Sequence, residues 1–180
     1  AIHRSLAEHG WFVTGNRALL SESLTDKILR ERLEPEGWSL GAWLSRRFDG
    51  GINRLASVLR LPLGPLRKLR SHHWEGARSC NLAVWRSDLD RVDGFDQAFS
   101  GWGKEDSDLL VRLLHAEVRR KDGSFATAVL HLWHPPADRS RLSLNEQKLE
   151  RVVGGNNVRA EQGMSTLAVS GTRAIAGKRA

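Results

Sequence analysis

Residues 101–110 read GWGKEDSDLL, a tryptophan between two glycines followed by three acidic residues and a pair of leucines. Glycine tolerates backbone conformations that bend a chain sharply, so a bend here can direct the following acids toward a cleft. Acidic residues also favour the first turn of a helix, because the helix dipole is positive there. The stretch therefore predicts a helix start, and it leaves open whether its carboxylates stabilise the helix or perform chemistry.

The composition limits the class of protein. The chain has 180 residues, of which 40% are hydrophobic, so it is long enough for one domain with a buried core. Its net charge of +7 favours a polyanionic partner, such as nucleic acid, an anionic membrane surface or a phosphorylated substrate. The single cysteine, Cys80, excludes an internal disulfide and cysteine-rich zinc sites, and it fits a reducing compartment. No apolar run approaches the roughly 20 residues of a membrane-spanning helix, which predicts a soluble or membrane-peripheral protein.

Strand and helix patterns alternate along the chain. Apolar and β-branched residues predict buried strands at 11–16, 77–86 and 125–134. Amphipathic patterns predict helices between Ser23 and Pro35 and at 87–94, 105–114 and 139–153. The alternation predicts an α/β fold.

Two segments depart from this pattern. Glycines and prolines interrupt residues 37–76, which predicts an irregular insertion. Within residues 46–78, eight basic side chains oppose only two acidic ones, so much of the positive charge is local. From Gly154 onward the chain is rich in Gly, Ala, Ser and Asn and has little periodicity. We therefore expect a domain over residues 1–153 and a poorly ordered tail over 154–180.

The acids of residues 101–110 lie beside an aromatic side chain. Trp102 offers a flat apolar face of the kind that stacks on sugar rings. A carboxylate next to such a face, Glu105 or Asp106, suits a general base for a sugar hydroxyl. Asp108 and Arg112 have the spacing of a helical ion pair.

The pattern D-x-D, which holds a divalent cation against a diphosphate in sugar-nucleotide enzymes, occurs at 88–90 and 106–108. In those enzymes it ends a hydrophobic strand, whereas both copies here begin helices. The sequence therefore predicts no such metal-holding pair in this chain.

Two histidines, His131 and His134, lie near the end of the strand predicted at 125–134. Residues three apart point to opposite faces of an ideal strand, so the two share a metal only if the chain bends between them. Pro135 favours an extended backbone at His134, at a strand exit where ligand-binding residues collect. His134 is therefore the stronger candidate ligand, and simple packing or solvation is the alternative.

The basic segment also contains His72, His73 and Trp74. Its aromatic residues are not spaced as stacking platforms, and no nucleic-acid-binding motif is present, so we expect no nucleic acid as partner. A basic surface that faces an anionic membrane is an alternative, as is a merely solvated face.

Residues 76–114, GARSCNLAVWRSDLDRVDGFDQAFSGWGKEDSDLLVRLL, followed by HLWHPPADRS at 131–140, resemble part of a known enzyme family. The resemblance is to the C-terminal, galactosyltransferase-like half of family 2 glycosyltransferases of the GT-A fold. The order of features matches: Asn81 in a strand, a G-F-D element, then W-G-x-E-D-x-D, a helical arginine and a histidine at a strand end. The likeness runs from about Trp11 to Val153. It implies a partial GT-A fold in which residues 1–153 form the acceptor and catalytic half.

The same resemblance implies roles for individual residues. Asp106 is the catalytic base, and Glu105 orients the acceptor. His134, with His131, completes a site for Mn²⁺ or Mg²⁺. The substrate-binding residues that it implies are Trp102, Gly103, Asn81, Asn16 and Arg17.

The implied reaction is an inverting transfer of a hexose from a nucleotide-sugar donor to a hydroxyl of a glycan or lipid-linked acceptor. Its setting is cell-surface polysaccharide synthesis, in the cytoplasm or on the cytoplasmic face of the membrane. The donor-binding half of the family, with its D-x-D, should precede Trp11, where this chain has ten residues. We therefore expect a fragment of such an enzyme. The alternatives are an inactive remnant or carbohydrate-binding piece, and a basic nucleic-acid-binding module.

Overall fold

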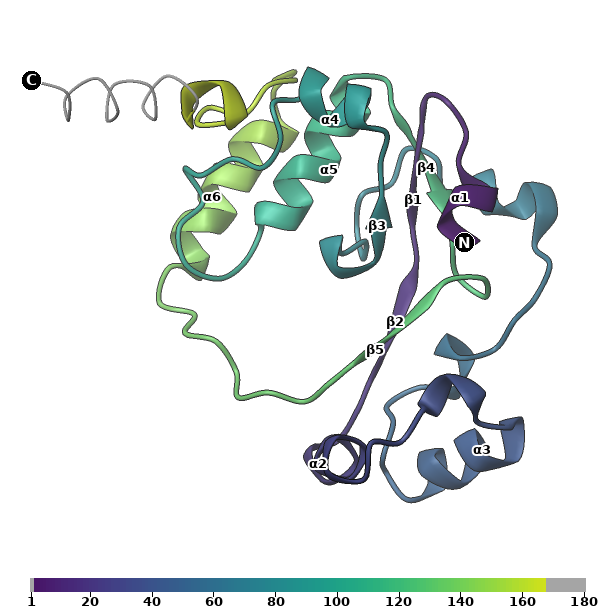
Figure 1. Cartoon of the computed structure of the whole chain (residues 1–180). Helices are drawn as coiled ribbons and strands as arrows, with labels where there is room; N and C mark the ends of the chain where they lie inside the picture. Colours follow the sequence, from purple (N-terminus) through teal and green to yellow (C-terminus); the bar gives the residue numbers. More distant parts are fainter. Residues whose placement is uncertain (1, 168–180) are drawn as a thin grey trace, which may run out of the picture.

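The computed structural model describes residues 2–167 and shows helices around two small β-sheets (Figure 1). The fold is mixed α/β, as the sequence predicts. The α-helices are α1 (Ile2–Leu6), α2 (Glu22–Glu31), α3 (Leu40–Phe48), α4 (Arg86–Arg91), α5 (Glu105–His115) and α6 (Leu142–Val153). The strands are β1 (Trp11–Thr14), β2 (Asn16–Leu19), β3 (Leu82–Ala83), β4 (Arg119–Asp122) and β5 (Ala128–His131).

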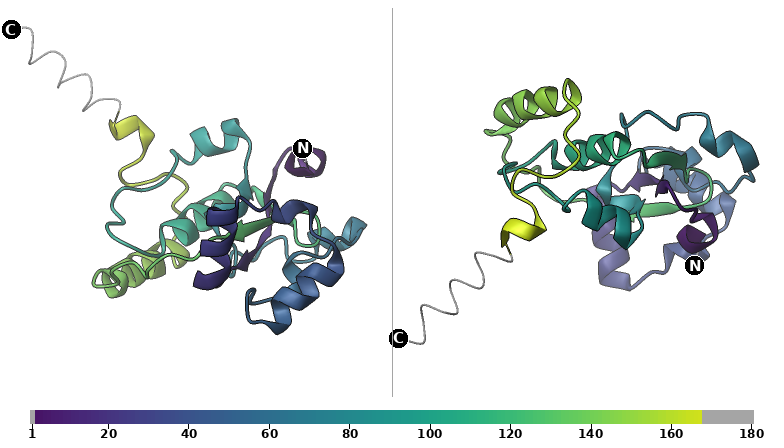
Figure 2. Two further views of the ribbon diagram at one scale, coloured as in Figure 1. Left: turned by 60° about the horizontal axis from the view of Figure 1, so that its bottom comes forward. Right: turned by 90° about the horizontal axis from the view of Figure 1, so that it is seen from above.

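Strand β1 lies at the centre of the first sheet, where it pairs antiparallel with β3 and parallel with β4. The second sheet is the parallel pair of β2 and β5. Since only one residue separates β1 from β2, the two sheets follow each other along a single ribbon. Helices α5 and α6 lie side by side at one end of this ribbon, and α2 and α3 lie at the other end (Figures 1 and 2).

The residue between β1 and β2 is a glycine for a steric reason. A Cβ atom on Gly15 would lie 2.1 Å from Oγ1 of Thr127 and 2.2 Å from Nδ2 of Asn81. Both distances are far shorter than any allowed contact, so the two side chains pack directly onto the glycine backbone. The ribbon therefore depends on glycine at this position.

Hydrophobic patterning does not predict β4, whose sequence is RRKD. Its long side chains are held by hydrogen bonds instead. Arg120 donates to Oγ1 of Thr14 at 2.8 Å, and Lys121 donates to Glu8 at 2.9 Å. The head groups of Arg120 and Lys121, which are partly buried, thus find partners on neighbouring segments.

Two hydrophobic clusters hold the structure together. The first lies between the sheet of β1 and helix α5, where Phe12, Leu109 and Leu113 are fully buried. The second packs α2 against α3, and its centre is formed by Leu24, Ile28, Trp43 and others. The apolar face predicted for the helix at 105–114 is thus the face that builds the first core.

Several predicted elements are shorter or more regular than expected. The strand predicted at 77–86 is reduced to β3, because residues 79–81 form a turn of 3-10 helix. The insertion predicted at 37–76 is partly irregular, but it contains the regular helix α3. The helix predicted at 139–153 is confirmed as α6.

The tail prediction is corrected for residues 154–167. Carboxylate oxygens of Asp96 accept hydrogen bonds from the backbone N–H groups of Glu161 and Gln162, at 2.7 and 3.1 Å. Oδ1 of Asp93 accepts another from the N–H of Ser165 at 2.9 Å. Two buried carboxylates thus anchor this segment, a tertiary effect that composition does not reveal. The rest of the predicted tail, residues 168–180, lies outside the described residues.

Within residues 2–167, no helix has the length and apolar character needed to cross a bilayer.

Candidate functional site

A cleft of about 480 Å³ lies at the first turn of α5. A second pocket, of about 320 Å³, adjoins it and shares three lining residues with it: Arg17, Trp102 and Arg139. Of the residues predicted from the sequence, the cleft contains Trp102, Gly103, Glu105, Asp106 and Arg17. The second pocket contains His131 and His134. The fold therefore gathers seven of the nine predicted site residues around one continuous depression.

The entry to α5 has the bend that its glycines predict. Gly101 and Gly103 have φ angles of 75° and 106°, and Lys104 between the bend and the helix has φ of 77°. No side chain caps this helix end, so the acids of the first turn are the groups that complement its dipole. The bend therefore presents Glu105 and Asp106 to the cleft.

The two acids differ in their surroundings. Oδ2 of Asp106 accepts a hydrogen bond from the backbone N–H of Ser79 at 3.2 Å. Oε2 of Glu105 is enclosed and has no hydrogen-bond partner among the described residues. An enclosed carboxylate oxygen without a donor is costly, so a ligand hydroxyl that reached it would relieve that cost. Both acids thus line the cleft, and Asp106 is the better fixed of the two.

Trp102 forms a wall of the cleft and is 44% exposed. The guanidinium of Arg139 lies over its ring, 4.7 Å from the centroid. Such a contact is a cation–π interaction. One face of the predicted sugar platform is therefore covered by an arginine, and a sugar would stack on the other face or displace that side chain.

Charges of both signs line the cleft. The basic side chains are Arg17, Arg78, Lys104 and Arg139, and the acidic ones are Glu75, Glu105, Asp106 and Glu146. Lys104 is paired with Glu146 at 3.1 Å. Arg17 has only a weak contact, with the sulfur of Cys80 at 4.0 Å. Arg17 is therefore free to bind an anionic ligand.

The two predicted histidine ligands do approach each other. Strand β5 ends at His131 and the chain then bends, which brings the ring centroids of His131 and His134 to 5.2 Å. Burial, helped by the charges of Arg17 and His134, lowers the pKa of His131 below its usual value. The lowered pKa favours the neutral form of its imidazole.

These imidazoles do not make a complete metal site. Nowhere in residues 2–167 do three His, Cys, Asp or Glu side chains gather as a cation site requires. The arginine next to His131 also opposes a second positive charge. The described residues thus supply two imidazole nitrogens, which do not fit Mn²⁺ or Mg²⁺ by themselves, and the role of His131 and His134 as metal ligands stays a prediction.

Asn81 and Asn16 do not line the cleft or the adjoining pocket. Oδ1 of the buried Asn81 side chain accepts a hydrogen bond from Nε2 of His3 at 2.7 Å, and its Nδ2 donates to the backbone oxygen of Asn16 at 2.7 Å. It therefore joins three segments of the ribbon. In the structure Asn81 therefore stabilises the fold, and the backbone oxygen of Asn16 accepts one of its hydrogen bonds.

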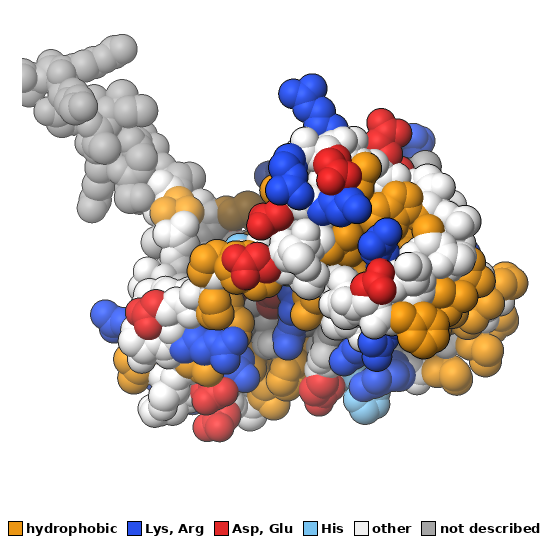
Figure 3. Space-filling view, turned by 90° about the horizontal axis from the view of Figure 1, so that it is seen from below, with side chains coloured by type: hydrophobic (Ala, Val, Ile, Leu, Met, Phe, Trp, Pro, Cys, Tyr) orange, Lys and Arg blue, Asp and Glu red, His pale blue; other side chains and the backbone are white. Residues whose placement is uncertain are grey.

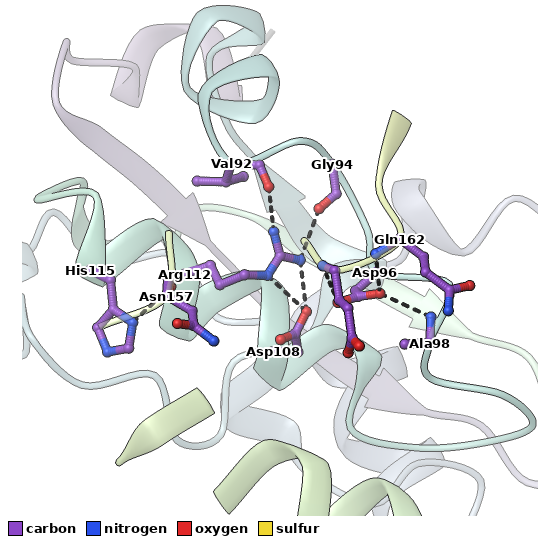
Figure 4. A network of polar contacts seen from close by, with 10 residues as sticks. Val92, Gly94, Asp96, Ala98, Asp108, Arg112, His115, Asn157 and Gln162 are labelled. Atoms are coloured by element: carbon purple, nitrogen blue, oxygen red, sulfur yellow. Dashed lines mark hydrogen bonds and ion pairs between the residues drawn. The ribbon is translucent and has the colours of Figure 1, made fainter. Parts of the chain in front are cut away.

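The predicted pair of Asp108 and Arg112 is confirmed, with N–O distances of 2.7 and 3.0 Å. Unlike a surface pair, it is fully buried. Figure 4 shows that the guanidinium also reaches the backbone oxygens of Val92 and Gly94, at 2.5 and 2.9 Å. Burial raises the pKa of Asp108, and the bonds from Arg112 oppose that rise. The pair ties α5 to the loop after α4, which fixes the helix that presents the acids.

Sequence patterns did not point to Ser79, Trp74 or Arg139 as site residues. Ser79 contributes a backbone N–H, which any residue other than proline could supply. Arg139 comes from a stretch without regular structure and reaches Trp102 only through the fold. The one signal for Arg139 was its position shortly after the histidines.

Comparison with known proteins finds one sequence family that matches part of the chain. Residues 67–135 match the sequence family described as the N-terminal domain of galactosyltransferase. No curated protein matches the chain. No solved structure matches it either. The matched segment includes the residues that meet Asp106, helix α5 and strand β5, so the acid-bearing wall of the cleft lies in the part of the chain that is similar to a galactosyltransferase domain, consistent with a partial GT-A-like fold.

Proposed function

We propose that this chain forms the acceptor side of an inverting, family 2-like hexosyltransferase, which transfers a sugar from a nucleotide sugar to a hydroxyl of a glycan or lipid-linked acceptor. The observation that carries the proposal is the position of Asp106 and Trp102 on one cleft, within the galactosyltransferase-like region. A sugar stacked on Trp102 would bring a hydroxyl near the carboxylates of the α5 first turn. The cleft thus combines an aromatic surface for a sugar, Trp102, with a candidate base, Asp106.

In the proposed reaction, the carboxylate of Asp106 removes the proton of the acceptor hydroxyl. The acceptor oxygen forms a bond to the anomeric carbon, the bond from that carbon to the diphosphate oxygen breaks, and the nucleoside diphosphate departs. Glu105 accepts a hydrogen bond from a neighbouring hydroxyl and so orients the acceptor. The direct displacement inverts the configuration at the anomeric carbon.

The leaving diphosphate needs positive charge. Arg17 and Arg139 line both the cleft and the adjoining pocket, so they could bind phosphate oxygens where the two meet. A divalent cation, which the family resemblance implies, would stabilise the same charge, but it would need ligands beyond His131 and His134. We therefore assign charge stabilisation in this chain to arginines. For its location we propose the cytoplasm or the cytoplasmic face of the membrane, which is compatible with the single exposed thiol of Cys80.

The test is a transfer assay on the native gene product that carries this chain, with UDP-galactose and other UDP-hexoses as donors and a panel of mono- and disaccharide acceptors. Asp106→Asn should lower kcat by about 10²- to 10⁴-fold, the usual contribution of a general base. Asp88→Asn is the matched control, because Asp88 belongs to the other D-x-D and lies outside the cleft. Wild-type turnover by Asp106→Asn would refute the assignment. Sugar binding without turnover in the wild type would favour the carbohydrate-binding alternative.

A further inference from the structure

Helix α3 carries a line of exposed hydrophobic side chains. Leu40, Leu44 and Phe48 are spaced by four residues, so they follow one face of the helix. Their exposed fractions are 54%, 37% and 87%. Such a row of large apolar side chains in water marks an interaction surface more often than a single exposed leucine does.

A neighbouring face of the same helix is buried against the rest of the protein. Trp43 is buried in the second hydrophobic cluster, against Leu20 and Leu24 of the ribbon and α2. A turn of the helix that hid Phe48 would therefore expose Trp43. The side chains of Leu40, Leu44 and Phe48 therefore stay exposed as long as the second hydrophobic cluster is intact.

Positive charge accompanies the apolar row. Arg47 lies on the same helix, is exposed and forms no ion pair with any described residue. Further along the basic segment, Arg54 and Arg60 are exposed and equally free of ion pairs within residues 2–167. Figure 3 looks onto the side of α2 and α3, and on the right, where α3 lies, hydrophobic side chains gather beside charged side chains, which include lysines or arginines as well as some acidic residues.

Not every cation of residues 46–78 is available. Arg67 is buried and donates to the backbone oxygens of Asp122 and Ser124, both at 2.8 Å. Lys68 is paired with Glu8 at 2.7 Å. Since these two serve the fold, the free cations that remain include those on and just after α3.

We propose that α3 is an interfacial helix by which the protein docks on an anionic lipid surface. The three apolar side chains enter the boundary between head groups and acyl chains, and Arg47 and its neighbours bind the phosphate and carboxylate groups of the lipids. Charge complementarity favours this occupant, because the unpaired cation of Arg47 lies on the same helix as the apolar row. The inference is independent of the proposed transferase chemistry and concerns a different part of the molecule.

The experiment is co-sedimentation of the 180-residue protein with vesicles of phosphatidylcholine, with or without 30% phosphatidylserine, at low and at physiological salt. We expect binding to the anionic vesicles that weakens as salt rises, and little binding to phosphatidylcholine alone. The triple variant Leu40→Ser, Leu44→Ser, Phe48→Ser should weaken binding by about tenfold or more, because it removes the apolar contact. Arg47→Gln should weaken vesicle binding less than the triple variant does, and it should reduce the salt dependence of that binding.

Two controls separate this surface from others. Leu29→Ser changes a leucine of α2 that is 59% exposed but lies off the row, and it should leave binding unchanged. Leu66→Ser with Leu69→Ser changes exposed leucines elsewhere in the basic segment. Circular dichroism and thermal unfolding verify that each variant is folded.

Three results would overturn the proposal. The wild type could fail to bind anionic vesicles at low salt. The triple variant could be folded and bind as the wild type does. The wild type could form a dimer in sedimentation velocity that the triple variant does not form, which would make α3 an interface between copies of this chain.

Discussion

The backbone N–H of Ser79 donates a hydrogen bond to Oδ2 of Asp106, across the boundary between a loop and the first turn of α5. That bond holds the carboxylate in one orientation. It also leaves Oδ1 of Asp106 as the oxygen available to an acceptor hydroxyl. The position of the proposed base is thus set by the backbone of a segment distant in sequence.

This relationship predicts a strong dependence on side-chain length. Asp106→Glu keeps the carboxylate but moves it by one methylene, so it can no longer satisfy both the Ser79 N–H and the acceptor. We expect kcat to fall by about 10²-fold with little change in acceptor KM, because the loss is one of alignment. Steady-state kinetics measure the effect. An unchanged kcat would mean that the Ser79 contact has no part in catalysis.

The exposed ring of Trp102 predicts an effect on acceptor binding. Trp102→Ala should raise acceptor KM by about tenfold, and Trp102→Phe should retain most of the affinity because it keeps an aromatic face. The matched control is Trp85→Ala, since Trp85 is 36% exposed but stacks on His9 away from the cleft. Equal KM changes in Trp102→Ala and Trp85→Ala would argue against a sugar platform at Trp102.

The buried pair of Asp108 and Arg112 predicts a large effect on stability. Arg112→Met leaves the carboxylate of Asp108 buried without a cation and removes two donors from backbone oxygens. We expect the free energy of unfolding to fall by about 3 to 5 kcal/mol, as measured by denaturant titration. The double variant Asp108→Leu, Arg112→Met should lose less than the sum of the single changes, because no uncompensated charge remains. Additive losses would contradict a direct pairing.

Local patterns predicted the acid-rich start of α5 well, because helix propensity and the dipole act within a few residues. The spacing of Asp108 and Arg112 likewise predicted their pairing. It could not predict their burial, which depends on carbonyl groups from the loop after α4. Local sequence thus specifies the helix, and the loop that packs on it determines how deeply Asp108 and Arg112 are buried.

The assembly of the cleft depends on contacts that no local pattern contains. Arg17 comes near His131 because β2 and β5 pair in parallel with Leu19 opposite His131. The charged strand β4 could not be predicted from hydrophobic patterning for a similar reason. Its hydrogen-bond partners Thr14 and Glu8 lie more than a hundred residues earlier in the sequence. Residues that lie within one motif were therefore predictable, and the sides of the cleft contributed by other segments were not.

The C-terminal segment is held by Asp93, and this predicts a response to acid. The hydroxyl of Ser165 donates to the carboxylate at 2.6 Å, and its backbone N–H donates as well. These bonds, with the charge of Arg159, hold the pKa of Asp93 below its ordinary value. The charged form is thus favoured in the folded protein, so the unfolded chain takes up the proton at a higher pH. The resulting stability is present above the ordinary pKa of about 3.8 and is lost as the pH falls through the folded value.

Ser165→Ala removes the largest cause of the lowered pKa. We expect the Asp93 carboxyl in this variant to titrate closer to its ordinary value in a carboxyl-detected NMR titration. The backbone N–H signal of residue 165, which donates to Asp93, should then lose its folded shift at a higher pH than in the wild type. Thr166→Ala, one residue further along and exposed, should titrate as the wild type does. Identical Asp93 titrations in the wild type and Ser165→Ala would mean that the hydroxyl does not bind the carboxylate in solution.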